Sequence, residues 1–310
     1  MTLRFVARRT LHSALLLVAI SVLSFLLFDL APGDFFNEIK LDPGISAGSA
    51  EALREQYGLT QAWPVRYWRW VESAGRGEFG VSFAYNMPVG QLMAPRIANT
   101  LLLTGLSLLV AWSVALPLGL VSARFDSGVP AGMALLLALP ELALAYAAVY
   151  FAAKTGWLPA GGMRGADGGG VLAHLVLPVL VLSLATLPVL VGHVRSALLQ
   201  VAEAPYIRAA RAHGIASGRL WTHHILPAAA NPLTALAGLS VAGLLSSSLL
   251  VEVIFNWPGL GPLLVEAIAA RDVFVVLGAV LYSAAFVIAG NLLGDLLLAA
   301  CDPRIRWGRR

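Results

Sequence analysis

The stretch EAPYIRAARAHGIASGRLWTHHILP, residues 203–227, is a polar segment between two long apolar runs. Pro205 suits the first turn of a helix, no breaker follows for eight residues, and Gly214 can adopt the positive φ that commonly ends a helix. Ser217 can cap a second helix, which Pro227 would end or kink. The stretch therefore predicts two short helices joined by a glycine turn.

The first expected helix is too short to cross a membrane. A helix of about nine residues is roughly 14 Å long, whereas a bilayer needs about 20 apolar residues. Ala209, Ala210 and Ala212 allow another surface to approach closely, while Arg208 and Arg211, three residues apart, share one charged face. This pattern indicates a docking helix beside a membrane. An ordinary solvated loop is the alternative.

The composition is that of a membrane protein. Of the 310 residues, 58% are hydrophobic and 12% are charged, against roughly 25% charged in a soluble domain. Residues 97–123 and 168–194 contain no Asp, Glu, Lys or Arg, and each run is long enough to cross the hydrocarbon core. Because the apolar segments recur evenly, we expect an all-α polytopic membrane protein in which residues 1–310 form one transmembrane domain.

Six transmembrane helices are expected, with long loops at residues 32–97 and at about residues 195–227. The first of these loops contains an aromatic cluster at Tyr67–Trp70, which favours a membrane interface. The glycine-rich segment 161–170 is expected to be a surface connection that does not pack. The expected spans are residues 10–31, 98–122, 129–153, 171–194, 228–251 and 273–301.

Arginines and lysines are distributed unevenly between alternate loops, which predicts the orientation. With the N-terminus in the cytoplasm, the segments on that side hold twelve of these residues and the short loops on the other side hold three. The long loop 32–97 is external and counts little toward the orientation. Both termini and Gly214 are therefore expected in the cytoplasm. The twelve are Arg4, Arg8, Arg9, Arg124, Arg195, Arg208, Arg211, Arg219, Arg304, Arg306, Arg309 and Arg310, and the three are Lys154, Arg164 and Arg271.

Three carboxylates lie within or at the edges of apolar spans, where a charge costs about 2.5 to 3.5 kcal/mol on insertion scales. Asp29 is close enough to the outer boundary to reach it, and Asp295 can meet arginines at the inner end of its span. Glu141 follows a proline, which can kink the helix. Glu141 is therefore the candidate for a translocation pathway, together with Ser246 and Ser247 of the fifth span.

Several classes of function lack the residues that they need. Neither Lys40 nor Lys154 stands in a phosphate-binding loop of the type GxxxxGK(S/T), so any ATP-driven step requires a nucleotide site on another polypeptide. The histidines form no HExxH pattern, Cys301 is the only cysteine, and no nucleophile stands with a base; we expect neither a metal site nor a catalytic residue. Basic residues flank spans without interleaved aromatics, so nucleic acid is not an expected partner.

The opening stretch resembles the cytoplasmic loop of permease subunits in ATP-binding-cassette importers. Aligned on Gly214, the segments Arg208–Ala210 and Leu226–Pro227 match that loop, with Arg208 and His224 standing where the pattern has Glu and Ile. The form YIRAARAHG at 206–214 is similar to the version in the dipeptide, oligopeptide and nickel permease family. Seven further landmarks resemble that family in the same order: LAPGD (30–34), YGL (57–59), GEFG (77–80), LPLG (116–119), FNWPGLG (255–261), ARD (270–272) and DPRIR (302–306).

The resemblance implies the architecture of a type I importer permease in a bacterial inner membrane, working by alternating access. It implies a second permease subunit, in a homodimer or a heterodimer, two ATPase subunits or domains that hold ATP and Mg²⁺, and an external substrate-binding protein. Besides these proteins, the chain would contact membrane lipid. The residues implied to dock on the ATPase are Tyr206, Arg208, Ala209, Ala210, Arg211, Gly214, Leu226 and Pro227.

Short peptides are the expected substrate, because members of this family carry dipeptides and oligopeptides. Nickel or metal chelates are the alternative within the same family, and the sequence does not decide between them. An ion-coupled secondary transporter is less well supported, because the chain shows no convincing internal repeat.

Overall fold

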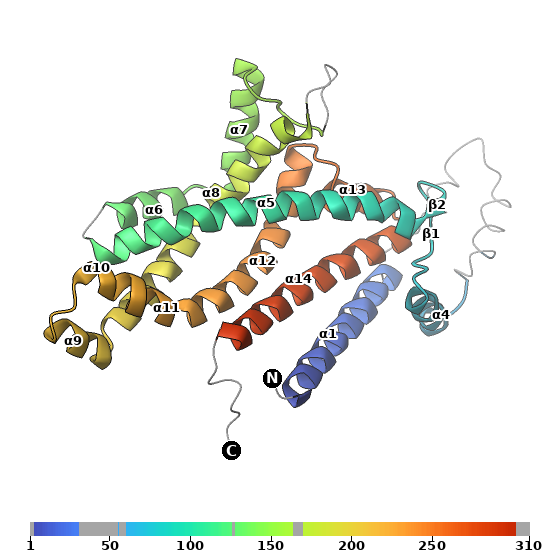
Figure 1. The fold of residues 1–310 in the computed structure, drawn as a ribbon. Coiled ribbons are helices and arrows are strands. Elements are labelled where there is room, and N and C mark those ends of the chain that lie inside the picture. The colour runs from blue at the N-terminus through green and yellow to red at the C-terminus, as the bar shows by residue number, and fades with distance from the viewer. Residues whose placement is uncertain (1–2, 31–54, 56–59, 126–127, 164–169, 302–310) are drawn as a thin grey trace. The chain divides into compact units, whose positions relative to one another are not determined.

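The computed structural model describes residues 3–30, 55, 60–125, 128–163 and 170–301, and these are largely helical (Figure 1). The chain divides into two compact units. Unit 1 comprises Met1–Arg9, Thr100–Trp257 and Phe286–Arg310, and unit 2 comprises Thr10–Asn99 and Pro258–Ala285. The elements in chain order are α1 (Leu3–Leu30), α4 (Trp63–Gly75), β1 (Val81–Ser82), β2 (Met87–Pro88), α5 (Val89–Arg124), α6 (Val129–Leu137), α7 (Glu141–Thr155), α8 (Val171–Ala202), α9 (Pro205–Ala212), α10 (Ser217–Leu220), the π-helical turn η1 (Trp221–Ile225), α11 (Leu226–Ala228), α12 (Ala230–Ile254), α13 (Leu260–Ala269) and α14 (Val273–Cys301).

The membrane spans follow the apolar runs. Among the described residues, five helices are long and apolar enough to cross a membrane, namely α1, α5, α8, α12 and α14, and α6 with α7 makes a sixth if the pair is counted as one span. The expected class, an all-α polytopic membrane protein, is confirmed. The long external loop expected at 32–97 is described only in part: residue 55 is described, and from residue 60 onward the chain forms α4, the β1–β2 hairpin and the first turns of α5, while 32–54 and 56–59 lie outside the described residues.

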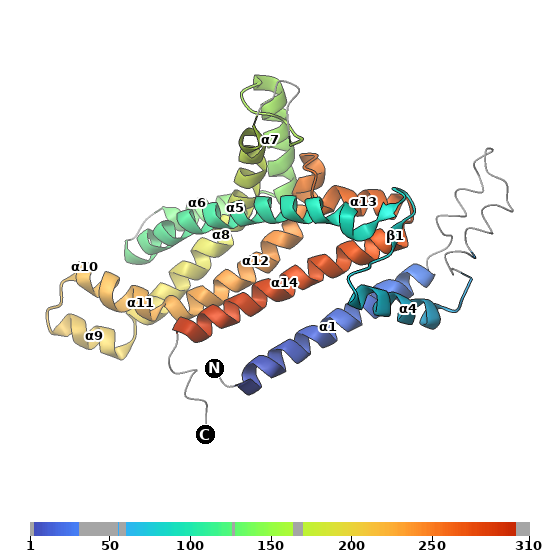
Figure 2. The same ribbon diagram turned by 45° about the vertical axis from the view of Figure 1, so that its right-hand side comes forward.

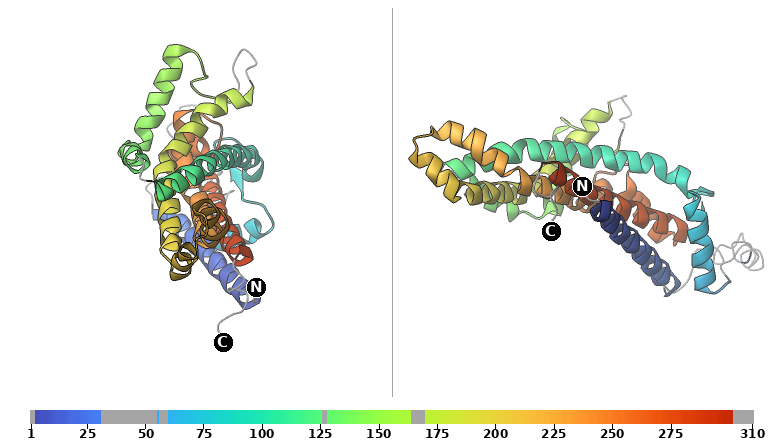
Figure 3. Two further views of the ribbon diagram at one scale, coloured as in Figure 1. Left: turned by 60° about the vertical axis from the view of Figure 1, so that its left-hand side comes forward. Right: turned by 60° about the horizontal axis from the view of Figure 1, so that its bottom comes forward.

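The third expected span, 129–153, is not one continuous helix. Helices α6 and α7 meet at an angle of 88° (Figure 3). Pro140 caps the start of α7 in an extended conformation, and it has no N–H to continue the ladder of α6. Proline also disfavours the helical conformation of the residue before it, so the break includes Leu139. The sequence predicts a kink at Pro140, and the structure instead has a sharp break between two separate helices.

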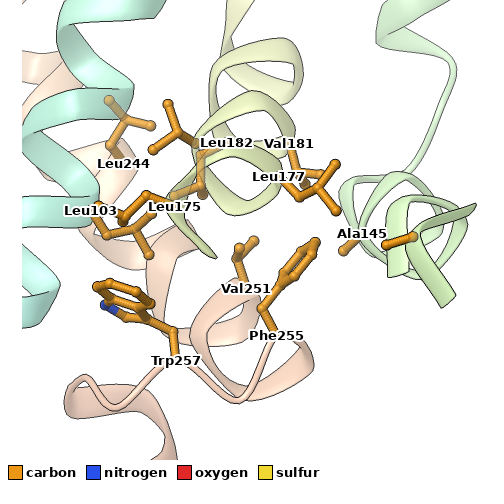
Figure 4. Packing of buried hydrophobic residues seen from close by; sticks show 12 residues of the cluster. Leu103, Ala145, Leu175, Leu177, Val181, Leu182, Leu244, Val251, Phe255 and Trp257 are labelled. Atoms are coloured by element: carbon orange, nitrogen blue, oxygen red, sulfur yellow. The ribbon is translucent and has the colours of Figure 1, made fainter. Parts of the chain in front are cut away.

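Helix α8 is the central element of unit 1. It packs against α6, α7 and α12, and it is the most buried of the five single-helix spans. Figure 4 shows leucines and valines of α8 meeting Leu103 of α5, Ala145 of α7 and the segment Val251–Trp257. Because lipid tails are as apolar as leucine, these contacts stabilise the unit through close packing rather than through transfer out of water.

The segment 160–163 packs against the end of α12, contrary to the expected exposed connection. The N–H of Gly162 donates to the carbonyl of Phe255 at 2.8 Å, and Nδ1 of the buried His174 lies 2.9 Å from the carbonyl oxygen of Gly161. A Cβ atom on Gly161 would lie 2.5 Å from the Phe255 oxygen, so only glycine fits. Absence of a side chain is what permits this packing. The rest of the glycine-rich segment, 164–169, lies outside the described residues.

In unit 2, helix α4 packs on α1 through aromatic rings. Phe25 of α1 contacts Tyr67 and Trp70 of α4, with ring centroids 5.5 and 6.3 Å apart. Asp29, at the end of α1, forms an ion pair with Arg66, so its charge is neutralised within the protein. The side chain of Asp295 lies outside the part of the chain whose side chains are described.

Candidate functional site

Helix α9 (Pro205–Ala212) is the short helix that the sequence predicts, and a glycine turn ends it. Gly214 has a φ of 80°. The N–H of Ile215 donates to the carbonyl of Ala210 at 3.3 Å, and the N–H of Gly214 donates to the carbonyl of Arg211 at 3.0 Å. These two bonds form a Schellman motif, which requires a left-handed residue at the position of Gly214. The predicted helix and its glycine stop are confirmed.

One buried side chain anchors α9 to the rest of unit 1. Ile207 is completely buried in an apolar cluster formed by α8, α9, α10, η1 and the residues that follow them. On the other faces of the helix, Tyr206, Arg208 and Arg211 are exposed, and among the described residues neither arginine has an ion-pair partner. Helix α9 therefore presents a cationic and aromatic surface on a fixed support. The buried cluster contains Val194, Ala197, Leu198, Ile207, Leu220, Trp221, Ile225, Ala229 and Leu233.

The second short helix differs from its prediction in two respects. Ser217 is the first residue of α10 rather than its cap; the cap position is Ala216, and no side chain caps it. The helix then widens into the π-helical turn η1, in which the N–H of Leu226 donates to the carbonyl of Trp221. In an α-helix the ring of Pro227 would meet the carbonyl of the residue four positions earlier, and the wider turn offers relief from that clash. The interruption that the proline predicts lies at Ala229, just after α11.

The remaining members of the expected docking set lie on two elements, α9 and α11, which are separated along the chain by α10 and η1 (Figure 2). Ala209 is exposed on α9, whereas Ala210 is half-buried and packs against the cluster that holds Ile207. Leu226 and Pro227 are exposed, but they belong to α11, beyond the π-helical turn. The structure thus gathers Tyr206, Arg208, Ala209 and Arg211 on one short helix and leaves Leu226 and Pro227 on another element.

Of the expected pathway residues, the structure brings two together. The carboxyl group of Glu141, in the first turn of α7, interacts with the side chain of Ser247 of α12, and its Oε1 atom is buried without a hydrogen-bond partner. Ser246 lies on a more exposed face of α12, and its hydroxyl donates to the carbonyl of Ala242 in its own helix at 3.1 Å. Glu141 and Ser247 therefore form a polar pair between two spans, and Ser246 is not part of it.

Sequence reasoning missed a buried carboxylate one turn further along α12. Glu252 is 0% exposed, and it follows the completely buried Ser248 by four residues, so the two side chains share one face. The expected span ended at Val251, which placed Glu252 in a loop. Because α12 continues to Ile254, the carboxylate lies inside the helix instead. Its signal in the sequence is a single acidic residue within the apolar run LLVEVIF.

A second missed carboxylate organises unit 2. Asp272 is 0% exposed; its Oδ2 accepts hydrogen bonds from the Ser82 hydroxyl at 2.6 Å and from the N–H of Ala84 at 3.1 Å. Its Oδ1 accepts from the N–H of Val275 at 3.3 Å, in the first turn of α14. One buried carboxylate thus joins the β1–β2 hairpin to the start of a span. Beside this junction the Tyr85 hydroxyl donates to Glu266 of α13.

The part of the chain that the structure describes contains no cluster of three or more His, Cys, Asp or Glu side chains that could hold a metal ion. The polar groups in unit 1 are instead those of the short exposed helix α9 and the carboxylates Glu141 and Glu252 in α7 and α12. This arrangement defines the class of the protein: a multi-span membrane protein with a polar helical hairpin, α9 and α10, presented outside its spans.

The comparisons with known proteins specify this class. The family model described as binding-protein-dependent transport system inner membrane component matches residues 115–307, and the model of the N-terminal part of that membrane component matches residues 2–104. The chain belongs to this family, the membrane components of binding-protein-dependent transport systems. It is accordingly a multi-pass inner-membrane permease of an importer whose family works with ATPase and binding-protein partners.

Curated relatives match along the whole chain. The oligopeptide transport system permease protein AppB of Bacillus subtilis is 35% identical over 314 residues, covering 98% of this chain and 99% of the relative. The glutathione transport system permease protein GsiC of Escherichia coli K12 is 33% identical over 311 residues with the same coverage. A putative peptide permease protein of Brucella ovis is 35% identical over 317 residues, again with that coverage. The resemblance to peptide permeases is confirmed.

A solved structure shares the fold. An inward-facing structure of the MetNI methionine ABC transporter aligns with a TM-score of 0.58 at 19% identity, covering 68% of this chain and 97% of that one. The fold is therefore that of a type I importer permease, as the sequence resemblance implied.

Proposed function

We propose that this chain is the membrane subunit through which an ATP-driven importer moves short peptides delivered by an external binding protein. The relatives reported above are named for oligopeptides, glutathione and peptides, which favours peptides over nickel or a metal chelate. The observation that carries the proposal is the exposed face of α9, held on a buried cluster in a chain of this family. The chain itself carries out no chemical step, because the hydrolysis of ATP belongs to partner subunits.

The proposed ATPase-docking surface is the exposed face of α9. Arg208 and Arg211 lie three residues apart and so share this face, whereas Tyr206, two residues before Arg208, is exposed on another side of the helix. The anchor at Ile207 keeps the helix in one position, so a push by a partner on α9 is transmitted to α8 and α12. We infer that each of two ATPase subunits or domains docks on one permease subunit, this chain or its partner in a homodimer or heterodimer. An acidic groove is the counterpart that fits two arginines.

The proposed orientation places both termini and α9 in the cytoplasm. The asymmetry of arginines and lysines supports it. The pair formed by Glu141 and Ser247 would then line, or lie close to, the route of the substrate between α7 and α12, since polar groups within spans usually face a cavity or other protein. Ser246 is not included in the proposed route, because its hydroxyl donates a hydrogen bond to the carbonyl of Ala242 in its own helix.

Stimulated ATP hydrolysis tests the substrate class. The chain is reconstituted in nanodiscs with its partner permease, its ATPase subunits and the binding protein, and hydrolysis is measured with di- to pentapeptides, with glutathione or with a nickel chelate. Stimulation by peptides alone supports the proposal, and stimulation by the chelate alone contradicts the assignment of peptides. A permease that transports without any ATPase subunit would contradict the proposed class of transporter.

Accessibility of single cysteines tests the orientation. Cys301 is first replaced by serine, and one cysteine is introduced at Gln61 or at Ser217, both of which are exposed. A maleimide that cannot cross membranes should label position 61 in intact cells and should label position 217 only after lysis. Labelling of position 217 in intact cells would reverse the proposed topology.

A further inference from the structure

The last two turns of α5 pack closely on α8 at a glycine. A Cβ atom on Gly119 would lie 2.4 Å from Cγ1 and 2.7 Å from Cβ of Val194. Both residues are buried, so a side chain at position 119 would push the two helices apart. Small residues allow helices in membrane proteins to approach each other in this way. The end of α5 therefore lies directly on α8.

One polar contact joins the same two helices next to this glycine. Nε of the half-buried Arg195 of α8 donates a hydrogen bond to the carbonyl of Ser122 of α5 at 3.2 Å. Ser122 is among the last four residues of α5, whose carbonyls have no partner within the helix, and the guanidinium also places a positive charge at the negative end of the helix dipole. A second hydrogen bond between α5 and α8, from the hydroxyl of Ser183 to the carbonyl of Ser107, lies about 22 Å further back along α5.

The contact of Arg195 lies beside the buried cluster that supports α9. Val194, its neighbour in α8, belongs to the cluster that holds Ile207, and Leu120 and Ala123 of α5 pack against that cluster. Apolar contacts are non-directional, so they allow one helix to slide on another. A hydrogen bond, in contrast, has a preferred length and direction. Arg195 therefore supplies a directional contact between the end of α5 and the support of α9.

From this arrangement we infer that Arg195 is a positioning residue for transport: it fixes the end of α5 on α8, so that both helices follow α9 when an ATPase subunit acts on it. Coupling between distant sites is carried by such chains of packed side chains and hydrogen bonds. Helix α5 has 36 residues and is about 54 Å long, so a shift at this end reaches far from α9. The inference rests on the proposed docking of an ATPase on α9.

Hydrogen exchange tests the inference on the permease and ATPase subunits assembled in nanodiscs. Exchange is compared with and without trapping by ATP and vanadate, in the peptides that cover residues 118–125 and 205–214. In the wild type, trapping should change exchange in both peptides. Arg195→Met replaces Nε by a methyl carbon at the same position along the side chain. In this variant residues 118–125 should exchange severalfold faster before trapping and should no longer respond to it, while residues 205–214 still respond.

Two matched variants separate the hydrogen bond from other effects. Arg195→Gln places an N–H donor at the same position along the side chain as Nε, so it should respond like the wild type. Ser122→Ala removes a hydroxyl that is buried without a hydrogen-bond partner and leaves the carbonyl in place, so it should also respond like the wild type. Equal losses in Arg195→Gln and Arg195→Met would show that the hydrogen bond is not what positions α5, and would overturn the inference.

Three other outcomes would overturn it as well. If Arg195→Met responds like the wild type at residues 118–125, α5 follows α9 without this bond. If Arg195→Met does not assemble with its partners, the residue serves folding rather than positioning. If only residues 205–214 respond in the wild type, the end of α5 does not follow α9. A wild type in which residues 205–214 themselves do not respond would contradict docking on α9, and the inference would fail with that proposal.

Discussion

Replacing Gly214 by valine tests whether α9 must keep the end that it has in this structure. The φ of this residue is 80°, in the left-handed region that favours glycine. A Cβ atom built at this position meets no atom within 4 Å, so the substitution costs nothing in packing. Its cost comes from the backbone alone, and a β-branched residue held at positive φ is strained by about 1 to 3 kcal/mol.

This strain should lower the affinity for a partner rather than the stability of the fold. In the free loop, valine can relax by leaving the left-handed region and giving up the two hydrogen bonds of the Schellman motif, while Ile207 keeps the helix attached. A partner that binds only the present conformation of α9 must return the backbone of the valine at position 214 to the left-handed region. The free energy of binding therefore becomes less favourable by up to the strain energy. A loss of about 1 to 3 kcal/mol corresponds to an affinity that is about 5 to 150 times weaker. The spans themselves should insert normally.

The assay is a titration of the ATPase subunits against the chain and its permease partner in nanodiscs. Gly214→Asn is the matched control, because asparagine has a volume close to that of valine but adopts the left-handed conformation at little cost. We expect the Asn variant to bind nearly as well as the wild type and the Val variant to bind weakly. Wild-type affinity of the Val variant would refute the reasoning, and equal losses in both variants would show that side-chain volume, not backbone strain, matters at this position.

Three further predictions concern Gly161 and Glu141 in unit 1 and Tyr85 in unit 2. Gly161→Ala should destabilise the purified protein by at least about 1 to 3 kcal/mol, because its Cβ would lie 2.5 Å from a backbone oxygen; thermal unfolding should show the loss, and Gly170→Ala, with open space around it, should not. Hydrogen bonding to Glu266, reinforced by burial, raises the pKa of Tyr85 above its ordinary value of 10.0, so this contribution to stability is complete below pH 10 and is lost as the pH rises through the raised value. Tyr85→Phe should abolish that alkaline loss in unfolding measurements. Glu141→Gln should reduce uptake while complex assembly stays normal, and uptake like the wild type would exclude Glu141 from the pathway.

The spans could be predicted because hydropathy depends on local composition. Long runs without charge identified α5 and α8 directly, and the polar stretch between α8 and α12 could only lie outside the bilayer. The corner between α6 and α7 was only partly predictable. Pro140 indicated an irregularity, but an angle of 88° depends on how both helices pack against α8, which no local pattern contains.

Helix α9 was predictable in part, and for the same reason. Its start at a proline and its end at Gly214 are local signals, whereas its anchor at Ile207 depends on a cluster gathered from five elements, α8, α9, α10, η1 and α12. The two buried carboxylates were missed for different reasons. Glu252 was assigned to a loop because the expected span ended at Val251, three residues before the end of α12. Asp272 binds Ser82, a partner 190 residues away in the sequence, which spacing cannot reveal.

The π-helical turn η1 has a consequence for chain length. A π-helical turn holds one more residue than the α-helical turn it replaces, and each residue of an α-helix adds about 100° of rotation and 1.5 Å of rise. Deleting one residue from Trp221–Ile225 would allow an uninterrupted α-helix at that point and would turn α9 and α10 by about a quarter turn relative to α12. This loop should therefore tolerate substitutions around η1 more easily than insertions or deletions, since adding or removing one residue would rotate α9 and α10 relative to α12.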